Sequence, residues 1–303
     1  MLHNNIKCDD LPLDIRGTYK FNISLKEMSF FKVGGICDVF FIPKDIDDLS
    51  YFLRNKPDNL KILCLGNMSN VLINDDGFRG CIVYLRDTFN NIFFDNIKNN
   101  VFVESGVSLQ GFIKKCADQG ISCLEKLMCI PGTIGGALKM NAGIPNCEIS
   151  DFLDSITLIN IHNGIIENIQ KKDLKMEYRN SNISDDYIIT SCILKTQVSS
   201  KEILHQEISD LTKKRISTQP IGQATCGSTF KNPKGFKAWE LIKNAGCVGF
   251  QVGDAKISDL HCNFIVNQGN ANASDILSLI NIVKQKVFEN SGILLEEEIK
   301  IIY

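Results

Sequence analysis

The residues best suited to chemistry lie in a glycine-rich run between Ile130 and Gly143. The run reads IPGTIGGALKMNAG, and five of its fourteen residues are glycine or proline. Glycine lowers the steric barrier to positive φ and lets a backbone approach a ligand closely. Successive exposed N–H groups in such a loop can bind an anion, typically a phosphate. A tight connection between buried elements is an open alternative for this run alone. The residues expected to offer the phosphate-binding surface are Gly132, Thr133 with its hydroxyl, Gly135 and Gly136.

A second polar loop, Gly66-Asn67-Met68-Ser69-Asn70, directly follows the strand-like segment KILCLG. Open sheets present ligands at the ends of their strands, and this loop adds hydroxyl and amide groups to the backbone donors. The chain contains no G-x-G-x-x-G run, which argues against an ordinary Rossmann dinucleotide site. Two separated loops of this kind could instead hold the two ends of a pyrophosphate.

The elements expected to position these loops are mostly short strands. Apolar, β-branched runs bounded by turn residues predict strands. Asn163-Gly164 predicts a turn before the last of them. The strand-like segments lie within 21–45 and at 61–66, 81–85, 101–105, 155–161 and 188–195. We therefore expect an α+β protein whose N-terminal two-thirds is rich in β-structure.

Apolar stripes at helical spacing predict helices between and after these strands. Ser108 is expected to cap a helix that ends at Gly120, because Leu109, Phe112 and Cys116 fall on one face. A charged helical stretch at 200–217 is expected to mark a domain boundary.

Two further helices are expected in the C-terminal third. In WELIKNAG, the residues Trp239, Ile242 and Ala245 are expected to lie on one face of a helix that stops at Gly246. The last helix is expected to begin at the cap Ser274 and to end at Gly292. A smaller α+β domain therefore follows the β-rich part.

Composition describes an ordinary water-soluble globular chain. It has 303 residues, 44% hydrophobic and 22% charged, which suffice for two or three domains. A net charge of −2 argues against a nucleic-acid partner held by a basic face. The N-terminus shows no signal-peptide pattern, and no apolar run approaches the roughly 20 residues of a membrane-spanning helix. We expect a cytoplasmic protein with no membrane partner.

Cysteine and histidine usage argues against metal and disulfides. The twelve cysteines are scattered without a C-x-x-C pair, and the four histidines show no metal-ligand spacing. Several cysteines replace apolar residues, as in KILCLG and KKCADQG, and free cysteine is commonly a small buried hydrophobe. We expect nearly all of them to be reduced core residues and expect no metal site.

Six motifs together resemble the UDP-N-acetylenolpyruvoylglucosamine reductases, flavoenzymes of bacterial cell-wall synthesis, over residues 20–302. In the family's order these motifs are LGNMSNVLINDDGFRGCIVYL, CIPGTIGGALKMNAG, EYRNS, QPIGQATCGSTFKNP, DLHCNFIVN and GILLEEEIKII. The resemblance implies a two-part FAD-binding region of the vanillyl-alcohol-oxidase/PCMH type, followed by a smaller α+β substrate-binding domain. The chain is similar to the shorter subclass of the family. It departs from the family's pattern at Met68, at Ile144-Pro145-Asn146-Cys147 and at Leu260.

Domain boundaries follow from the same resemblance. We expect the first FAD-binding subdomain at residues 1–86 and the second at 87–200. The C-terminal substrate-binding domain is then expected at 201–303.

The family reaction, as the resemblance implies it, reduces the enolpyruvyl ether of UDP-N-acetylglucosamine enolpyruvate to the lactyl ether of UDP-N-acetylmuramate. NADPH reduces bound FAD, and the reduced flavin delivers hydride from N5 to the vinyl carbon. Negative charge then spreads into the carboxylate, and the neighbouring carbon takes a proton. Such a site needs a held carboxylate, stabilisation of its growing charge and a proton donor.

Three residues are expected to meet these needs. Arg179 in EYRNS presents a planar donor fork to a carboxylate, although a surface ion pair is its ordinary role. Ser228 in CGSTF matches the family's proton donor, although Gly-Ser is also a common turn pair. Glu298 matches the family's acid, and alternation in LLEEEIKII predicts a strand with Glu296 and Glu298 on one face. Glu296 and Glu297 are expected to be solvated.

The remaining expected contacts also come from the resemblance. Both substrates are expected to use one cleft in turn, with ping-pong kinetics, on a monomer. The weaker candidates for substrate contact are Tyr178, Lys231 and Asn232. The expected FAD contacts are Gly66, Asn67, Ser69, Asn70, Pro131, Gly132, Thr133, Gly135 and Gly136.

Two other functions are alternatives. Another flavoenzyme of the same cofactor fold, such as a sugar or alcohol oxidase, would not need Arg179, Ser228 and Glu298 together. A non-catalytic protein that binds FAD or a UDP-sugar would show tight binding without turnover.

Overall fold

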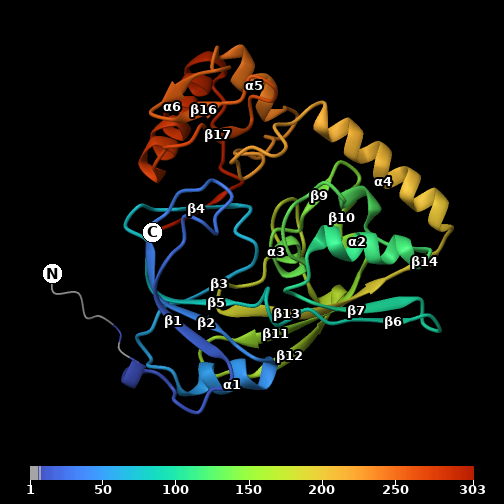
Figure 1. Ribbon diagram of the computed structural model, residues 1–303. Helices are drawn as coiled ribbons and strands as arrows, with labels where there is room; N and C mark the ends of the chain where they lie inside the picture. Colours follow the sequence, from blue (N-terminus) through green and yellow to red (C-terminus); the bar gives the residue numbers. More distant parts are fainter. Residues whose placement is uncertain (1–5, 7) are drawn as a thin grey trace. The chain divides into compact units, whose positions relative to one another are not determined.

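The chain forms two compact units that interleave along the sequence. The computed structural model describes residue 6 and residues 8–303 (Figure 1). Most of the N-terminal stretch that we expected to carry no signal peptide therefore lies outside the described residues. The first unit comprises Met1–Ile23, Asp38–Asn67 and Arg79–Thr212, and the second comprises Ser24–Cys37, Met68–Phe78 and Lys213–Tyr303. The expected boundaries at residues 86 and 200 remain predictions.

One sheet of the first unit has four strands in the order β1-β2-β5-β3, with β3 parallel to β5. Helix α1 packs its apolar face, including Phe52, into the same core as Phe41 of β2. Asp45 caps this helix by accepting the Asp48 N–H at 2.9 Å. The elements are β1 (Thr18–Ser24), β2 (Ile36–Ile42), α1 (Ile46–Asn55), β3 (Ile62–Leu65) and β5 (Phe78–Tyr84).

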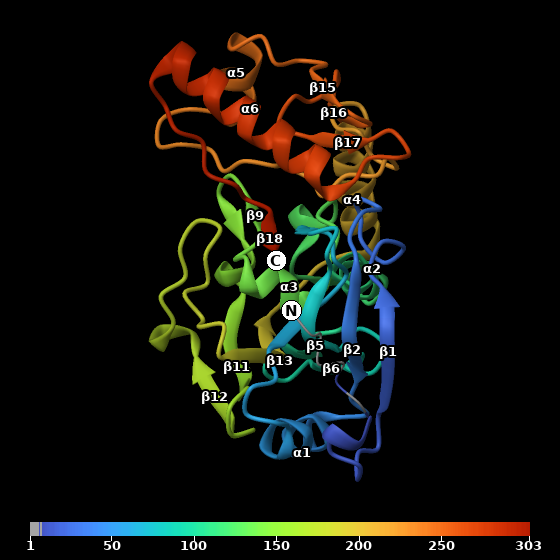
Figure 2. The same cartoon turned by 90° about the vertical axis from the view of Figure 1, so that its left-hand side faces the viewer.

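The other large sheet of this unit is antiparallel, in the order β12-β11-β13-β7-β6. Helices α2 and α3 lie on one of its faces (Figure 1), and α3 contacts β7 and β13. Figure 2 shows β11 and β12 side by side. The elements are β6 (Ile92–Asp95), β7 (Asn100–Glu104), α2 (Leu109–Asp118), α3 (Ile134–Lys139), β11 (Leu153–Asn160), β12 (Ile166–Gln170) and β13 (Tyr187–Lys195).

Short elements complete the first unit. Strand β8 pairs with β14, and β9 pairs with β10 around Pro145-Asn146, with Asn146 at φ +64°. The short strands are β8 (Ile121–Ser122), β9 (Gly143–Ile144), β10 (Cys147–Glu148) and β14 (Gln197–Val198). The 3₁₀ helices are η1 (Cys8–Asp10), η2 (Glu125–Leu127), η3 (Ile149–Asp151) and η4 (Lys171–Asp173).

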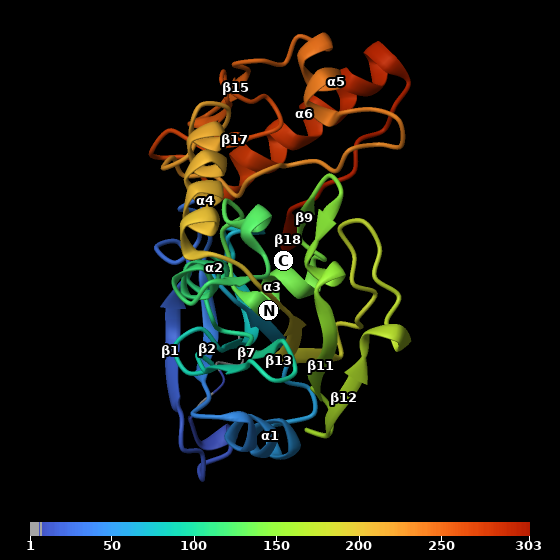
Figure 3. The ribbon, with the colours of Figure 1, turned by 90° about the vertical axis from the view of Figure 1, so that its right-hand side faces the viewer.

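In the second unit, α6 packs against a three-stranded antiparallel sheet, β15-β16-β17. Helices α5 and α6 contact each other and lie side by side in Figures 2 and 3. Strand β4 pairs in parallel with β18 near the C-terminus. The chain enters this unit within α4 (Lys201–Ile216). The other elements are β4 (Val71–Ile73), α5 (Ala238–Asn244), β15 (Gln251–Val252), β16 (Ala255–Ile257), β17 (Ile265–Asn267), α6 (Ala273–Ser291) and β18 (Lys300–Ile302).

Two predicted helix starts have different outcomes. Ser108 caps α2, because its side chain accepts the Gly111 N–H at 3.3 Å, so that prediction is confirmed. Ser274 as the cap of α6 is wrong. Asn272 is the cap, and it forms a capping box in which its side chain accepts the Asp275 N–H at 2.7 Å. The reciprocal Asn272-to-Asp275 bond satisfies a second backbone donor, which a cap at Ser274 would not do.

The face predicted for α5 from Trp239, Ile242 and Ala245 differs from the face that the helix buries. Trp239 is 37% exposed, whereas Ala238, Leu241 and Ile242 are buried. With only seven residues, α5 buries a stripe at spacings of three and four residues, and Trp239 falls outside it.

An aspartate from a distant segment caps α6 a second time. Asp75 accepts the N–H groups of Ala273 at 2.8 Å and of Ser274 at 3.0 Å. These are two of the donors that a helix start leaves unpaired. This contact helps to hold segment 68–78 in the second unit.

Replacing Asp75 with alanine should therefore lower the free energy of unfolding by about 1 kcal/mol, the usual cost of losing a cap. Chemical denaturation of Asp75→Ala and the wild type measures this difference. The exposed Asp58 provides a control, and Asp58→Ala should be neutral. Equal stability of the two variants would contradict the capping role.

None of the twelve cysteines, all of which the structure describes, forms a disulfide, and nine of them are buried. Burial raises the pKa of the Cys116 and Cys226 thiols to about 12. Thiols with raised pKa values stay protonated and poorly nucleophilic near neutrality. The predicted core location is confirmed for these nine cysteines, and their reduced state stays a prediction.

Thiol labelling should distinguish Cys8 from the rest. At about pH 8 the native protein should show one fast reaction with Ellman's reagent, at the exposed Cys8. Cys8→Ser should abolish that phase, and denaturant should expose the others. Rapid reaction of several thiols in native Cys8→Ser protein would contradict the buried assignment.

Candidate active site

The two predicted phosphate-binding loops meet within the first unit. Gly66 follows β3, and Thr133 is the residue that caps α3. A Cβ on Gly66 would collide with Thr133 Oγ1, so this close approach requires glycine. The end of β3 and the glycine-rich run are therefore neighbours.

Backbone pairing sets the orientation of Thr133. Leu109 N–H donates to Gly132 O at 3.1 Å, and Ile134 N–H donates to Val107 O at 2.9 Å. These bonds flank an antiparallel bridge between Ser108 and Thr133, so the Thr133 N–H points away from Ser108. Its hydroxyl accepts the Gly136 N–H at 3.2 Å and keeps its own proton to donate.

The amides of Gly135 and Gly136 are engaged within the protein. Gly135 N–H donates to Ser105 O at 2.9 Å, and Gly136 N–H donates to Thr133. The expected nest of free N–H groups is therefore not formed by these two residues. A Cβ on Gly135 would lie 2.7 Å from Ser105 Cβ, so packing alone explains that glycine.

Packing within the protein does not explain why position 136 is a glycine. It is exposed, and a Cβ there would meet only Thr133 Oγ1, at an ordinary 3.5 Å. A glycine inside a helix makes the helix less stable than an alanine would, by about 0.5–1 kcal/mol. Nearby, Ser105 Oγ is buried with no hydrogen-bond partner among the described residues. An uncovered glycine and an unpaired hydroxyl both fit a polar cofactor lying along this run.

From Met68 onward, the first loop belongs to the second unit. Met68 is buried with φ +50°, and its carbonyl accepts the Phe30 N–H at 3.3 Å. Asn70 donates through Nδ2 to Glu298 O at 3.1 Å. Asn67 and Ser69 are half-buried, as is Pro131 of the second loop. Asn70 therefore supports the backbone of a predicted catalytic residue directly.

Ser228 lies in an extended segment held on both sides. It pairs with Phe264 on one side, while Phe230 pairs with Glu297 on the other. The Asn263 side chain accepts the Phe230 N–H at 3.0 Å and donates to Phe230 O at 2.8 Å. Gly227, at φ +79°, turns the chain into this segment. The backbone position of Ser228 is therefore closely fixed.

The same pairing brings Glu298 next to the Ser228 segment. Glu298 N–H donates to Thr229 O at 2.8 Å, and Lys231 N–H donates to Glu296 O at 2.9 Å. The predicted strand is regular only from Lys300 onward, because the glutamates make isolated bridges instead of a continuous ladder. Two segments far apart in the sequence thus lie side by side.

The neighbouring glutamates have cationic partners. Glu296 Oε2 lies 3.4 Å from Lys231 Nζ, and Glu297 Oε1 lies 2.7 Å from Lys284 Nζ. Glu296 is exposed, whereas Glu297 and Glu298 are half-buried. Glu297 is therefore less solvated than expected.

Arg179 lies in the first unit, within a tight turn. Glu177 N–H donates to Asn180 O at 2.7 Å, and Asn180 N–H donates to Glu177 O at 3.0 Å. Arg179 has φ +55°, a conformation that few non-glycine residues adopt. Its Nη2 donates to Gly143 O at 2.7 Å.

The weaker substrate candidates have identifiable structural contacts. Tyr178 is 45% exposed, and its ring centroid lies 4.7 Å from Arg179 Cζ. Asn232 Oδ1 accepts the Ala238 N–H at 2.9 Å, which helps to begin α5. A role in substrate binding stays a prediction for Tyr178, Lys231 and Asn232.

His261 is a titratable neighbour of the Ser228 segment that the sequence analysis did not select. Its Nδ1 accepts the Asn263 N–H at 3.3 Å, and its ring packs edge-on against Phe264. Burial lowers the pKa of His261, which favours the neutral ring near pH 7. The position of His261 inside the DLHCNF motif is the sequence feature that could have pointed to it.

Two other kinds of feature are absent from residue 6 and residues 8–303. No group of three or more His, Cys, Asp or Glu there is arranged to hold a metal ion. None of the helices in that part of the chain is both long and apolar enough to cross a membrane.

Comparison with known proteins decides the family. The C-terminal domain of UDP-N-acetylenolpyruvoylglucosamine reductase matches residues 219–302, and an FAD binding domain matches residues 37–170. The reductase of Rickettsia bellii is 41% identical over 96% of this chain and 95% of its own length. That of Orientia tsutsugamushi is 42% identical over 95% of each. The chain belongs to the UDP-N-acetylenolpyruvoylglucosamine reductase family.

A solved structure of the family agrees. The chain is similar to UDP-N-acetylenolpyruvylglucosamine reductase (MurB) from Thermus caldophilus, with a TM-score of 0.80 and 31% identity. The match covers 95% of this chain and 100% of that one. The predicted family, the α+β fold with an FAD-binding region and the class of FAD-dependent oxidoreductase are confirmed. The roles of individual residues remain predictions.

Gly136→Ala separates a cofactor contact from a purely structural glycine. The protein without FAD should become more stable by about 0.5–1 kcal/mol, because alanine is the better helix former. If FAD lies against Gly136, its affinity should fall about tenfold through overpacking. Denaturation of the apoprotein and FAD titration measure the two effects.

Gly111→Ala is a matched control. Gly111 takes the same position in α2, where its N–H is bound by the capping Ser108 and a Cβ would meet only Ser108. This variant should gain similar stability and keep the wild-type FAD affinity. Unchanged FAD affinity in Gly136→Ala would contradict the contact.

Proposed function

We propose that this chain is an FAD-dependent reductase that converts UDP-N-acetylglucosamine enolpyruvate into UDP-N-acetylmuramate, with NADPH as reductant. Membership of the family supports this reaction. The observation that carries it is the side-by-side backbone pairing of the Ser228 and Glu298 segments. We place the reaction in the cytoplasm, on a monomer, as a step of peptidoglycan precursor synthesis.

FAD is the bound cofactor that this chemistry requires. When bound, it supplies the hydride that reduces the enolpyruvyl double bond. The candidates to hold it are the close approach of Gly66 to Thr133 and the uncovered Gly136. Thr133 contributes a hydroxyl proton and an outward N–H, both suited to phosphate oxygens.

Arg179 is assigned to the substrate carboxylate. A guanidinium keeps its charge and matches a carboxylate with two parallel N–H bonds. The positive φ of Arg179 supports a functional role, because such a conformation persists only where surrounding contacts hold it. A guanidinium that is already held in place stabilises the negative charge that develops on the substrate, and it need not reorganise during the reaction.

Ser228 is assigned to proton donation and Glu298 to hydrogen bonding with the developing enediolate. A serine hydroxyl is a weak acid, so its proton moves only toward a strongly basic carbon placed within hydrogen-bond reach. The clamp from Asn263 and from the 296–298 segment supports such placement. A protonated Glu298 carboxyl would donate to the substrate carboxylate as charge accumulates there.

Ser228→Ala should separate the two half-reactions. FAD binding and flavin reduction by NADPH should match the wild type, because neither needs the serine. Product formation should fall roughly 100- to 10,000-fold, the usual contribution of a positioned acid. Anaerobic stopped-flow absorbance follows both steps on one sample.

The exposed Ser217 at the end of α4 provides the control, and Ser217→Ala should leave both steps unchanged. Equal loss of both half-reactions in Ser228→Ala would indicate general damage and count against proton donation. Unchanged product formation would also reject the assignment.

A further inference from the structure

The turn that carries Arg179 is anchored to the segment directly after the glycine-rich run. Asn141 Nδ2 donates to Glu177 O at 3.0 Å, at the first residue of the turn. Arg179 Nη2 donates to Gly143 O at 2.7 Å. Both anchors follow α3, which begins at the loop proposed to hold FAD.

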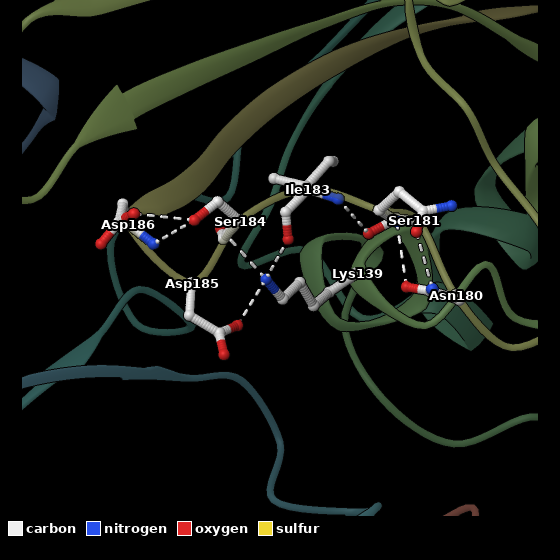
Figure 4. A network of polar contacts seen from close by, with 8 residues as sticks. Lys139, Asn180, Ser181, Ile183, Ser184, Asp185 and Asp186 are labelled. Atoms are coloured by element: carbon white, nitrogen blue, oxygen red, sulfur yellow. Dashed lines mark hydrogen bonds and ion pairs between the residues drawn. The ribbon is translucent and has the colours of Figure 1, made fainter.

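The far side of the turn is held by Lys139, the last residue of α3. Figure 4 shows its ammonium pointing into the loop after Arg179. Lys139 Nζ donates to Ile183 O at 2.7 Å and to Ser184 O at 3.2 Å, and it lies 2.7 Å from Asp185 Oδ1. One side chain thus holds three consecutive residues.

These contacts matter because the intervening chain has little regular structure of its own. Between η4 and β13, the backbone forms the turn at Glu177–Asn180, and near β13 Ser184 O accepts the Tyr187 N–H and Asp186 O accepts the Ile161 N–H; the other contacts are local side-chain bonds. Positive φ at Arg179 and at Asn182 adds conformational cost. Without anchors at both ends, the guanidinium would sample many positions.

We propose that Lys139 is a positioning residue that fixes the Arg179 guanidinium for the carboxylate of the substrate. This inference rests on the proposed function, because it takes the ligand of Arg179 to be the enolpyruvyl carboxylate. Lys139 acts through backbone carbonyls and touches no reacting atom.

The hydrogen bonds from Lys139 to the Ile183 and Ser184 carbonyls hold the Arg179 turn in place, and the ion pair with Asp185 does not. The Asp185 side chain is 99% exposed, and exposed ion pairs contribute little. The Lys139 side chain is only 34% exposed, and its bonds to Ile183 and Ser184 are charge-assisted. Lys139→Met removes the ammonium and keeps an apolar stem, whereas Asp185→Ala removes the ion pair alone.

Binding of two ligands tests the proposal. Lys139→Met should weaken binding of UDP-N-acetylglucosamine enolpyruvate about tenfold, since a small displacement of a binding group has large effects. It should leave the affinity for UDP-N-acetylglucosamine, which lacks the carboxylate, unchanged, together with FAD affinity. Lys139→Arg should restore most of the loss, and Asp185→Ala should resemble the wild type.

A double-mutant cycle shows whether Lys139 acts through Arg179. In an Arg179→Ala background, Lys139→Met should cause no further loss of enolpyruvyl affinity. Full additivity of the two changes would overturn the positioning role, as would equal weakening of both UDP ligands by Lys139→Met. Wild-type protein that fails to bind the enolpyruvyl sugar would reject the proposed function itself. Normal wild-type binding with an unaffected Lys139→Met would reject only the role of Lys139.

Discussion

The chemistry proposed for this chain depends on the backbone pairing that clamps residues 228–231. On one side the Asn263 side chain binds both polar backbone groups of Phe230, and on the other Glu298 donates to Thr229 O. Within residues 228–231, only backbone groups take part in these bonds. The bonds therefore fix the segment whichever rotamers its own side chains adopt. A weak acid such as a serine hydroxyl needs this accuracy, since proton transfer requires hydrogen-bond reach. The buried Phe230 at the centre of the segment anchors it in the core of the second unit.

In the first unit, glycines at neighbouring positions serve different purposes. Gly66 allows Thr133 to approach, and Gly135 allows α3 to pack on Ser105. Gly136 meets no such demand from the protein, which is why it is the most informative candidate for a cofactor contact. The helix that begins here ends at Lys139, beside the anchors of the Arg179 turn. One short helix therefore connects the proposed cofactor loop to the proposed carboxylate-binding arginine.

Local sequence patterns predicted much of the fold, because caps and apolar stripes act over a few residues. Ser108 capped its helix as expected, and the helix predicted at 200–217 lies at Lys201–Ile216. The prediction failed where two nearby residues could each cap the same helix, as Asn272 and Ser274 could for α6. The resemblance predicted the family and its FAD. The glycine-rich run did not reveal that the Gly135 and Gly136 amides are hydrogen-bonded within the protein. Long-range features were also hidden, such as Asp75 capping α6 and the positive φ of Arg179.

The most direct test of the central claim uses the wild-type protein with bound FAD. The flavin is reduced with NADPH without oxygen and then mixed with UDP-N-acetylglucosamine enolpyruvate. The absorbance of oxidised flavin should return, and UDP-N-acetylmuramate should form in step with it. A flavin that stays reduced with this substrate, in a protein whose oxidised flavin is reduced by a sugar alcohol, would contradict the account.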